Sequence, residues 1–343
     1  MAYKFSIEER VLHFKQPAGT SRGVYTERRS WFVTVSDGEA VGRGECAPLP
    51  DLSCDAQPGY AGVLRRFCDD VERSGTIDYE QMRDYPSMLF GIETALLDLA
   101  SAREGRAGRL FDTPFARGET GIPINGLVWM GTFEEMSQRI EQKLQQGFRC
   151  VKLKIGAIDF DDEMALLKKI RDRFGPRELE LRADANGAFS FDEALYKLEL
   201  LSQYALHSIE QPIRARQWAD MAELCREAPL PIALDEELIG VNEYEQKRQM
   251  LNIIKPAYIV LKPSLHGGMA GVREWVDISR DMGIGSWITS ALESNIGLNA
   301  VAQLCSDIYG DHITMAQGLG TGQLFTDNIP MGLEVRGDIL TCF

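Results

Sequence analysis

From residue 121 onward the chain repeats one pattern, a short apolar run followed by a longer segment whose apolar residues recur at helical spacing. A short apolar run is typical of a strand buried on both faces, and a period near 3.6 residues is typical of an amphipathic helix. Strands are predicted at residues 122–125, 150–154, 179–183, 208–210, 232–235, 258–261, 286–289 and 313–316. Helices are predicted between them at residues 133–146, 160–174, 191–204, 218–226, 242–250, 269–282 and 294–309.

Strict alternation of strand and helix implies right-handed crossovers between parallel strands, and eight such strands favour closure into a barrel. An open doubly wound sheet is the competing fold, and it usually carries a glycine-rich turn after its first strand. The first turn of this chain, Gly126-Leu127-Val128-Trp129, lacks that pattern. The sequence therefore predicts an α/β barrel.

The N-terminal third has a different texture, in which apolar and polar positions alternate. The alternating runs lie at residues 3–14, 30–35 and 40–45, with an Asp37-Gly38 turn between the last two. They predict an antiparallel meander. Amphipathic helices are expected at residues 60–73 and 86–103. We expect an α+β domain over residues 1–110, the barrel over 111–317, and a tail over 318–343 that returns toward the first domain.

Composition and charge narrow the class of protein. With 44% hydrophobic and 26% charged residues, the chain has the composition of a soluble globular protein. Its net charge of −14 disfavours binding to nucleic acid or to an anionic membrane. The sequence shows neither a signal peptide nor a membrane-spanning stretch. We expect a cytoplasmic protein that binds a small molecule, as a monomer or homo-oligomer.

The seven cysteines are scattered along the chain and never occur as C-x-x-C. Disulfides and a thiolate zinc site are therefore not expected, because such sites need paired or closely spaced cysteines. The cysteines are interpreted as small apolar residues in a reducing compartment. The four histidines also lack ligand spacing, and none receives a role.

Acidic residues occur at the ends of three successive predicted strands, Asp184, Glu210 and Asp235. The carboxyl ends of barrel strands converge on one mouth, so these side chains are expected to lie together. Three neighbouring carboxylates repel one another unless a cation lies between them. Oxygen ligands favour a hard ion, Mg²⁺ with Mn²⁺ possible. Taken singly, each acid has a plainer interpretation, as an Asx turn, a solvated loop acid or a helix start.

Lysines occupy the same phase of the repeat. Lys152 and Lys154 flank Leu153, so the period of two points both lysines toward the barrel interior. Lys262 follows the sixth strand, roughly across the barrel, although alone it would be taken for an exposed lysine. Two such groups on opposite faces of a metal-bound carboxylate suit removal of a proton α to that carboxylate, with the metal stabilising the enediolate.

Two features near the last strands are weaker indications of a binding site. Ser290 ends the seventh strand, and Gly318-Leu319-Gly320-Thr321-Gly322 follows the eighth. Backbone N–H groups of a glycine-rich loop can approach a carboxylate or phosphate closely. A plain flexible turn is an equally good interpretation of this loop.

The strand-end motifs together resemble those of the enolase superfamily. They are Lys152-Leu153-Lys154, Asp184-Ala185-Asn186, Glu210-Gln211-Pro212, Asp235-Glu236 and Val260-Leu261-Lys262-Pro263. A lysine on both the second and the sixth strand resembles the muconate-lactonizing-enzyme-like branch. Thr289-Ser290-Ala291 stands where a histidine would indicate the mandelate racemase-like branch. The resemblance implies a modified TIM barrel, (β/α)7β, with an N-terminal α+β capping domain.

The resemblance also implies roles for individual residues. Lys154 would be the base, Lys262 would stabilise the enediolate, and Lys152 would orient Lys154. Asp184, Glu210 and Asp235 would hold Mg²⁺. Substrate contacts would come from Ser290, Gly318, Gly320, Asn186 and Arg22, the last in a cap segment, residues 20–25, that closes over the substrate.

Segments 290–298 and 318–322 resemble members of this branch that dehydrate 2-succinyl-6-hydroxy-2,4-cyclohexadiene-1-carboxylate in menaquinone biosynthesis. The alternative in the same branch is racemisation of an N-succinylamino acid or epimerisation of a dipeptide. Dipeptide epimerases carry acids in the loop after the eighth strand, and residues 318–322 have none. An alternative of another class, a non-catalytic metal-dependent binding protein, would be expected to lack one of the lysines.

Overall fold

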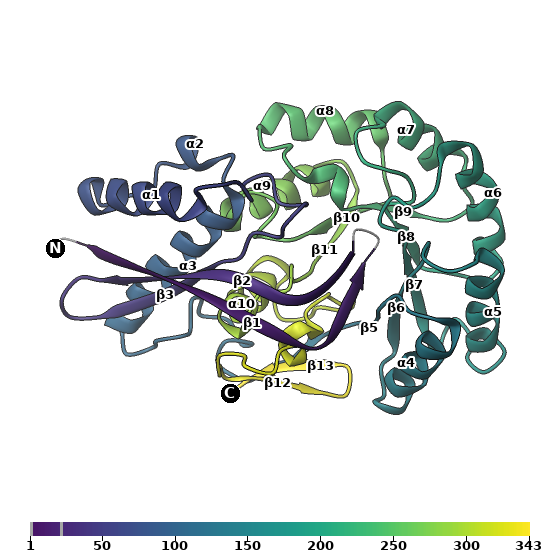
Figure 1. The fold of residues 1–343 in the computed structure, drawn as a ribbon, viewed down its shortest axis with the longest axis horizontal. Coiled ribbons are helices and arrows are strands. Elements are labelled where there is room, and N and C mark those ends of the chain that lie inside the picture. The colour runs from purple at the N-terminus through teal and green to yellow at the C-terminus, as the bar shows by residue number, and fades with distance from the viewer. Residues whose placement is uncertain (1–2, 21–22) are drawn as a thin grey trace.

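The computed structural model describes residues 3–20 and 23–343, which form a capping domain packed against a barrel of alternating strands and helices (Figure 1). The capping domain has an antiparallel sheet of β1 (Lys4–Thr20), β2 (Gly23–Ser36) and β3 (Val41–Cys46), in that order. Its helices are α1 (Tyr60–Ser74), α2 (Tyr79–Met82) and α3 (Pro86–Arg103). The predicted meander and both predicted helices are present.

Close packing of β3 on α3 depends on glycines. A Cβ at Gly44 would collide with the carbonyl oxygen of Gly91 in α3, and a Cβ at Gly42 would collide with that of Ala95. The backbones of strand and helix therefore approach more closely than any side chain allows. The two glycines of Gly42-Arg43-Gly44 therefore allow β3 to pack directly on α3 inside the cap.

Replacing Gly44 by alanine is expected to destabilise the protein by roughly 3 kcal/mol, because the added methyl group must push backbone atoms apart. The midpoint of urea-induced unfolding measures the change. Gly62→Ala on α1 is the matched control, since a Cβ there meets no described atom within 4 Å. That substitution should leave stability unchanged or raise it slightly. Equal midpoints for the two variants would contradict the close contact.

The barrel is a curled sheet of parallel strands in the order β11-β10-β9-β8-β7-β6-β5. The strands are β5 (Gly126–Val128), β6 (Cys150–Lys154), β7 (Glu180–Asp184), β8 (Ser208–Glu210), β9 (Ile232–Leu234), β10 (Tyr258–Leu261) and β11 (Gly285–Ile288). From β6 to β11 every strand lies within one residue of its prediction. The apolar runs located them because these strands are buried on both faces.

Helices follow the strands and cover the outer face of the sheet, as Figure 1 shows for α4 to α8. They are α4 (Phe133–Gln145), α5 (Phe160–Arg171), α6 (Phe191–Ser202), α7 (Trp218–Glu227), α8 (Tyr244–Ile254), α9 (Gly268–Asp281) and α10 (Asn295–Tyr309). Short 3₁₀ helices occur at η1 (Glu236–Leu238) and η2 (Gly320–Gln323). In the described chain, no helix has the length and apolar character needed to cross a membrane.

The first and last predicted barrel strands differ from the structure. The prediction at 122–125 is replaced by β4 (Ile122–Pro123), which pairs antiparallel with β13 (Ile339–Cys342), and by β5 after it. β12 (Leu333–Arg336) completes this small C-terminal sheet. Pairing between segments over 200 residues apart leaves no local periodicity, so the sequence pattern could not reveal it.

The predicted eighth strand, residues 313–316, is reduced to bridges at the two residues that follow it. Gln317 pairs with Ile124, and Gly318 pairs with Thr289. Asn125 N donates to the carbonyl oxygen of Gln317 at 3.0 Å. This short segment therefore joins the two edges of the curled sheet and closes the barrel.

The C-terminal tail contacts the capping domain. Lys15 N donates to Leu324 O at 2.8 Å, and Thr326 N donates to His13 O at 2.9 Å. The β1–β2 hairpin extends from the cap toward the mouth of the barrel (Figure 1). The domain limits at residues 110 and 317 stay predictions.

Candidate active site

Side chains of β6 alternate between two environments. Val151 and Leu153 are buried in the apolar core that also includes Leu166 and Leu167 of α5. Lys152 and Lys154, on the other face of the strand, line a cavity of about 260 Å³ at the carboxyl ends of the strands. The sequence of β6 therefore directs two ammonium groups into the barrel mouth.

Strand register places the three predicted carboxylates side by side. Asp184 pairs with Lys154 on one side and with Glu210 on the other, and Glu210 pairs with Ala233, two residues before Asp235. The three acids are at most 2% exposed. The structure thus brings together the acids that the sequence phase predicted to meet.

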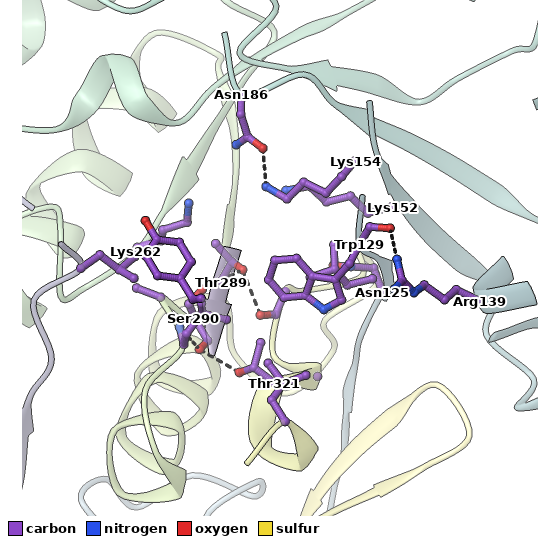
Figure 2. Close-up of a pocket in the computed structure, with 18 of the residues that line it drawn as sticks. Asn125, Trp129, Arg139, Lys152, Lys154, Asn186, Lys262, Thr289, Ser290 and Thr321 are labelled. Atoms are coloured by element: carbon purple, nitrogen blue, oxygen red, sulfur yellow. Dashed lines mark hydrogen bonds between the residues drawn. The ribbon is translucent and has the colours of Figure 1, made fainter. Parts of the chain in front are cut away.

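The lysines neutralise these acids. Lys152 Nζ lies 2.9 Å from Asp184 Oδ2 and 2.5 Å from Glu210 Oε2. Lys154 Nζ donates to Asp184 Oδ2 at 2.7 Å, and Lys262 Nζ donates to Asp235 Oδ2. Lys154 and Lys262 enter the cavity from different sides (Figure 2). Buried charge is tolerated here because every ammonium has a carboxylate partner.

In this cluster, the charges of neighbouring lysines and carboxylates shift the pKa values of most of the groups. Burial would raise the pKa of Asp184 and Asp235, but the neighbouring ammonium groups outweigh burial and lower both. Burial would lower the pKa of Lys152 and Lys262, but the carboxylates outweigh it and raise both. At Glu210, burial and then the charge of Asp184 dominate and raise the pKa.

The donor set fits a hard divalent cation. Glu210 Oε1 and Asp235 Oδ1 are buried and have no hydrogen-bond partner in the described part of the chain. As the side chains stand in residues 3–20 and 23–343, no three Asp, Glu, His or Cys side chains form a group that could hold a metal ion. The Lys152 ammonium bridges Asp184 and Glu210 instead. Asp184, Glu210 and Asp235 would hold such a cation once the Lys152 ammonium moves from between the first two.

Asn186, a predicted substrate contact, lines the cavity and also contacts Lys154. Its Oδ1 accepts a hydrogen bond from Lys154 Nζ at 2.7 Å, drawn in Figure 2. Its Nδ2 donates to Glu236 Oε1 at 2.9 Å. The φ of Asn186 is 45°, in the left-handed region that asparagine tolerates better than most residues. Asn186 therefore links Lys154 to the 3₁₀ turn after β9.

The Ser290 hydroxyl is fully engaged within the protein. It donates to Glu293 Oε2 at 2.7 Å, and it accepts from Thr321 Oγ1 at 2.8 Å and Leu292 N at 3.0 Å. A hydroxyl has one proton to donate. Ser290 therefore cannot donate to a ligand without releasing Glu293, although it lines the cavity.

The remaining predicted contacts lie around the same cavity or outside the described residues. Gly318 and Gly320 both line it, and a Cβ at Gly318 would collide with Thr289 Oγ1. Arg22 lies outside the described residues, so its predicted contact has no structural description. Of the predicted cap segment, Tyr25 lines the cavity.

Sequence reasoning missed a wall of the cavity formed by Asn125, Leu127 and Trp129. These residues alternate along β5 and its flanks, so the period of two could have found them. Arg139 of α4 supports this wall by donating to the carbonyl oxygens of Trp129, at 3.0 Å, and Met130, at 2.8 Å. Figure 2 shows the Trp129 indole between the lysines and Thr321.

A capped barrel with lysines and carboxylates at its strand ends defines a class of enzymes. The sequence model of the Enolase C-terminal domain-like family matches residues 135–327, and that of the MenC N-terminal domain matches residues 12–99. The chain belongs to the enolase superfamily, in its muconate-lactonizing-enzyme-like branch. Members of this superfamily depend on a divalent metal.

The chain is also similar to individual members of the superfamily. The chain is 47% identical to the o-succinylbenzoate synthase of Desulfotalea psychrophila over 96% of both chains. The crystal structure of MenC from that organism superposes with a TM-score of 0.83 at 42% identity, covering 99% of this chain and 100% of the other. The N-succinylamino acid racemase of Thermus thermophilus is 34% identical over 48% of this chain and 42% of its own.

Proposed function

We propose that this protein is an o-succinylbenzoate synthase, a lyase of menaquinone biosynthesis that removes water from 2-succinyl-6-hydroxy-2,4-cyclohexadiene-1-carboxylate. The observation that carries the proposal is full-length similarity to a relative with that name, in a chain whose Lys154 and Lys262 both reach one cavity. The ammonium groups and glycine backbone around this cavity suit a substrate with two carboxylates.

Lys154 is assigned both proton transfers. With Lys154 as the neutral amine, the C–H bond α to the ring carboxylate breaks, its proton passes to the lone pair of Lys154 Nζ, and the electron pair of that bond delocalises into the ring carboxylate as an enediolate. The C–O bond of the ring hydroxyl then breaks, Lys154 returns the proton to the departing oxygen, and water leaves as the ring becomes aromatic. Because one group serves both steps, hydrogen and hydroxyl depart from the same face, which makes the elimination syn.

The other residues manage charge and position. A divalent cation held by Asp184, Glu210 and Asp235 would stabilise the charge that develops on the substrate carboxylate as the α-proton leaves. Lys262 would stabilise the same charge from the opposite face. Lys152, which pairs with Asp184 and Glu210 in this structure, would keep a positive charge beside both acids and orient Lys154, two residues further along β6.

The far end of the substrate is assigned to the wall formed by Ser290, Gly318 and Gly320. The succinyl carboxylate would contact backbone N–H groups there, since the Ser290 hydroxyl is engaged with Glu293. Arg22 would add a charged contact from the cap segment, and Asn186, which lines the cavity, would contact the substrate while it accepts a hydrogen bond from Lys154.

Two further parts of the proposal concern the metal and the compartment. Mg²⁺ is assigned as the cation, because three carboxylates and no nitrogen or sulfur ligand suit it, and Mn²⁺ should substitute. A cytoplasmic location is assigned because all seven cysteines are free in the structure, as in a reducing compartment.

Racemisation of an N-succinylamino acid is the second candidate. Lysines on two sides of one carboxylate could take a proton from one face and return it from the other. Dipeptide epimerisation is less suited, since residues 318–322 offer no acid to an α-ammonium group. A non-catalytic binding protein would not need both Lys154 and Lys262 in the cavity.

Purified protein with Mg²⁺ should convert the cyclohexadiene substrate, with ultraviolet absorbance of the diene falling as the aromatic product forms. Prior treatment with a chelator should stop the reaction, and added Mg²⁺ should restore it. In parallel, an N-succinylamino acid in deuterium oxide reports α-proton exchange. Exchange without any loss of the diene would replace the synthase assignment with the racemase one.

A further inference from the structure

The turn that follows β10 holds the backbone of Lys262 from both sides. Leu265 N and His266 N donate to the carbonyl oxygen of Lys262, at 2.8 and 2.9 Å. The N–H of Lys262 donates to Nδ1 of the His266 ring at 2.9 Å. One short turn therefore satisfies both backbone polar groups of this lysine.

The position of Lys262 explains why a side chain is needed as an acceptor. β9 pairs with β10 only at Tyr258 and Ile259, while the last bond on the β11 side runs from Thr289 N to Leu261 O. Lys262 lies just beyond this ladder. A buried N–H without an acceptor is unfavourable, so the imidazole takes the place of a missing strand partner.

In the described structure, one of the two nitrogens of the buried His266 ring takes part in a hydrogen bond. The residue is 1% exposed, and because Nδ1 accepts a hydrogen bond, the proton of the neutral ring lies on Nε2. Nε2 has no hydrogen-bond partner in residues 3–20 and 23–343. The backbone of His266 packs closely on α9, since a Cβ at Gly271 would collide with the carbonyl oxygen of His266. Among the described residues, the buried ring therefore makes one hydrogen bond, which it accepts from the N–H of Lys262.

We propose that His266 is a positioning residue for Lys262, holding its backbone so that its ammonium reaches Asp235 and the side of the cavity away from Lys154. Pro263 restricts Lys262 to extended backbone conformations, and the imidazole fixes its end of the strand within that range. This role rests on the proposed function for its kinetic consequence, because Lys262 is assigned there to stabilise charge.

Three substitutions separate the hydrogen bond from the volume of the ring. His266→Phe keeps a planar ring and removes the acceptor. His266→Asn places an amide oxygen near the position of Nδ1, and His266→Gln places it near that of Nε2. We expect His266→Phe and His266→Gln to lower kcat by about 10- to 100-fold, the range found for partners that orient metal ligands. KM should change by less than about threefold, and His266→Asn should recover most of kcat.

A second readout does not depend on turnover. Amide hydrogen exchange in peptides spanning residues 258–268 should accelerate in His266→Phe and stay slow in His266→Asn, with peptides elsewhere unchanged. If the wild-type protein failed to consume the diene, the proposed function would fail, while this exchange would still decide the role of His266. Unchanged exchange and kcat in His266→Phe, or equal global acceleration in all three variants, would overturn the inference.

Discussion

Lys154→Ala is expected to lower kcat by at least about 10³-fold, because a positioned general base contributes up to about 10⁴-fold and this lysine is assigned both proton transfers. Metal affinity should change little, since Lys154 is not assigned as a ligand and the three buried carboxylates are unchanged. Turnover of the diene measures the first effect, and calorimetric titration with Mg²⁺ measures the second.

Lys154→Arg sharpens this test. Arginine keeps the positive charge next to Asp184 but stays protonated, so it cannot accept a proton. It should be as inactive as the alanine variant. Lys168→Ala is the matched control, because Lys168 is an exposed lysine of α5 paired with Asp172. Substantial activity in Lys154→Arg would show that Lys154 acts through its charge and not as a base.

Asp184→Asn is expected to cause the second large effect, a loss of affinity for Mg²⁺. The change keeps the shape of the side chain and removes the negative charge that contacts both Lys152 and Lys154. Loss of an outer partner of a metal ligand lowers affinity by about 10- to 100-fold, and loss of a ligand should exceed that range. Titration with Mg²⁺ measures the affinity, and turnover should fall with it.

The control for this prediction is Asp172→Asn, an exposed carboxylate paired with Lys168. It should bind Mg²⁺ as the wild-type protein does. Thermal unfolding of both variants checks that the barrel stays intact, since Asp184 is fully buried. Unchanged Mg²⁺ affinity in a folded Asp184→Asn protein would remove Asp184 from the ligand set.

The local pattern of apolar and polar residues was sufficient to predict the strands in the middle of the barrel. β6, β8 and β10 have the bounds that the sequence pattern predicted, because strands buried on both faces are rich in apolar residues. The alternation around Leu153 also directed Lys152 and Lys154 inward. A period of two is a property of any strand, so it needs no knowledge of neighbours.

Closure of the barrel needed long-range pairing. Ile122–Pro123 joins a sheet with Ile339–Cys342, and Gln317 bridges to Ile124. These partners are chosen by register between distant segments, which local hydrophobic periodicity does not encode. For the same reason the first strand was placed a few residues early, and the eighth was predicted where only bridges follow.

The sequence by itself determined which acids and lysines share the barrel mouth, because those at successive strand ends keep the phase of the βα repeat. Only the tertiary structure decided what each of them contacts. Ser290 is engaged with Glu293, Asn186 with Lys154, and the imidazole of His266 with the backbone of Lys262. A strand's period fixes the direction of a side chain, whereas its hydrogen-bond partner depends on how separate strands and turns pack together.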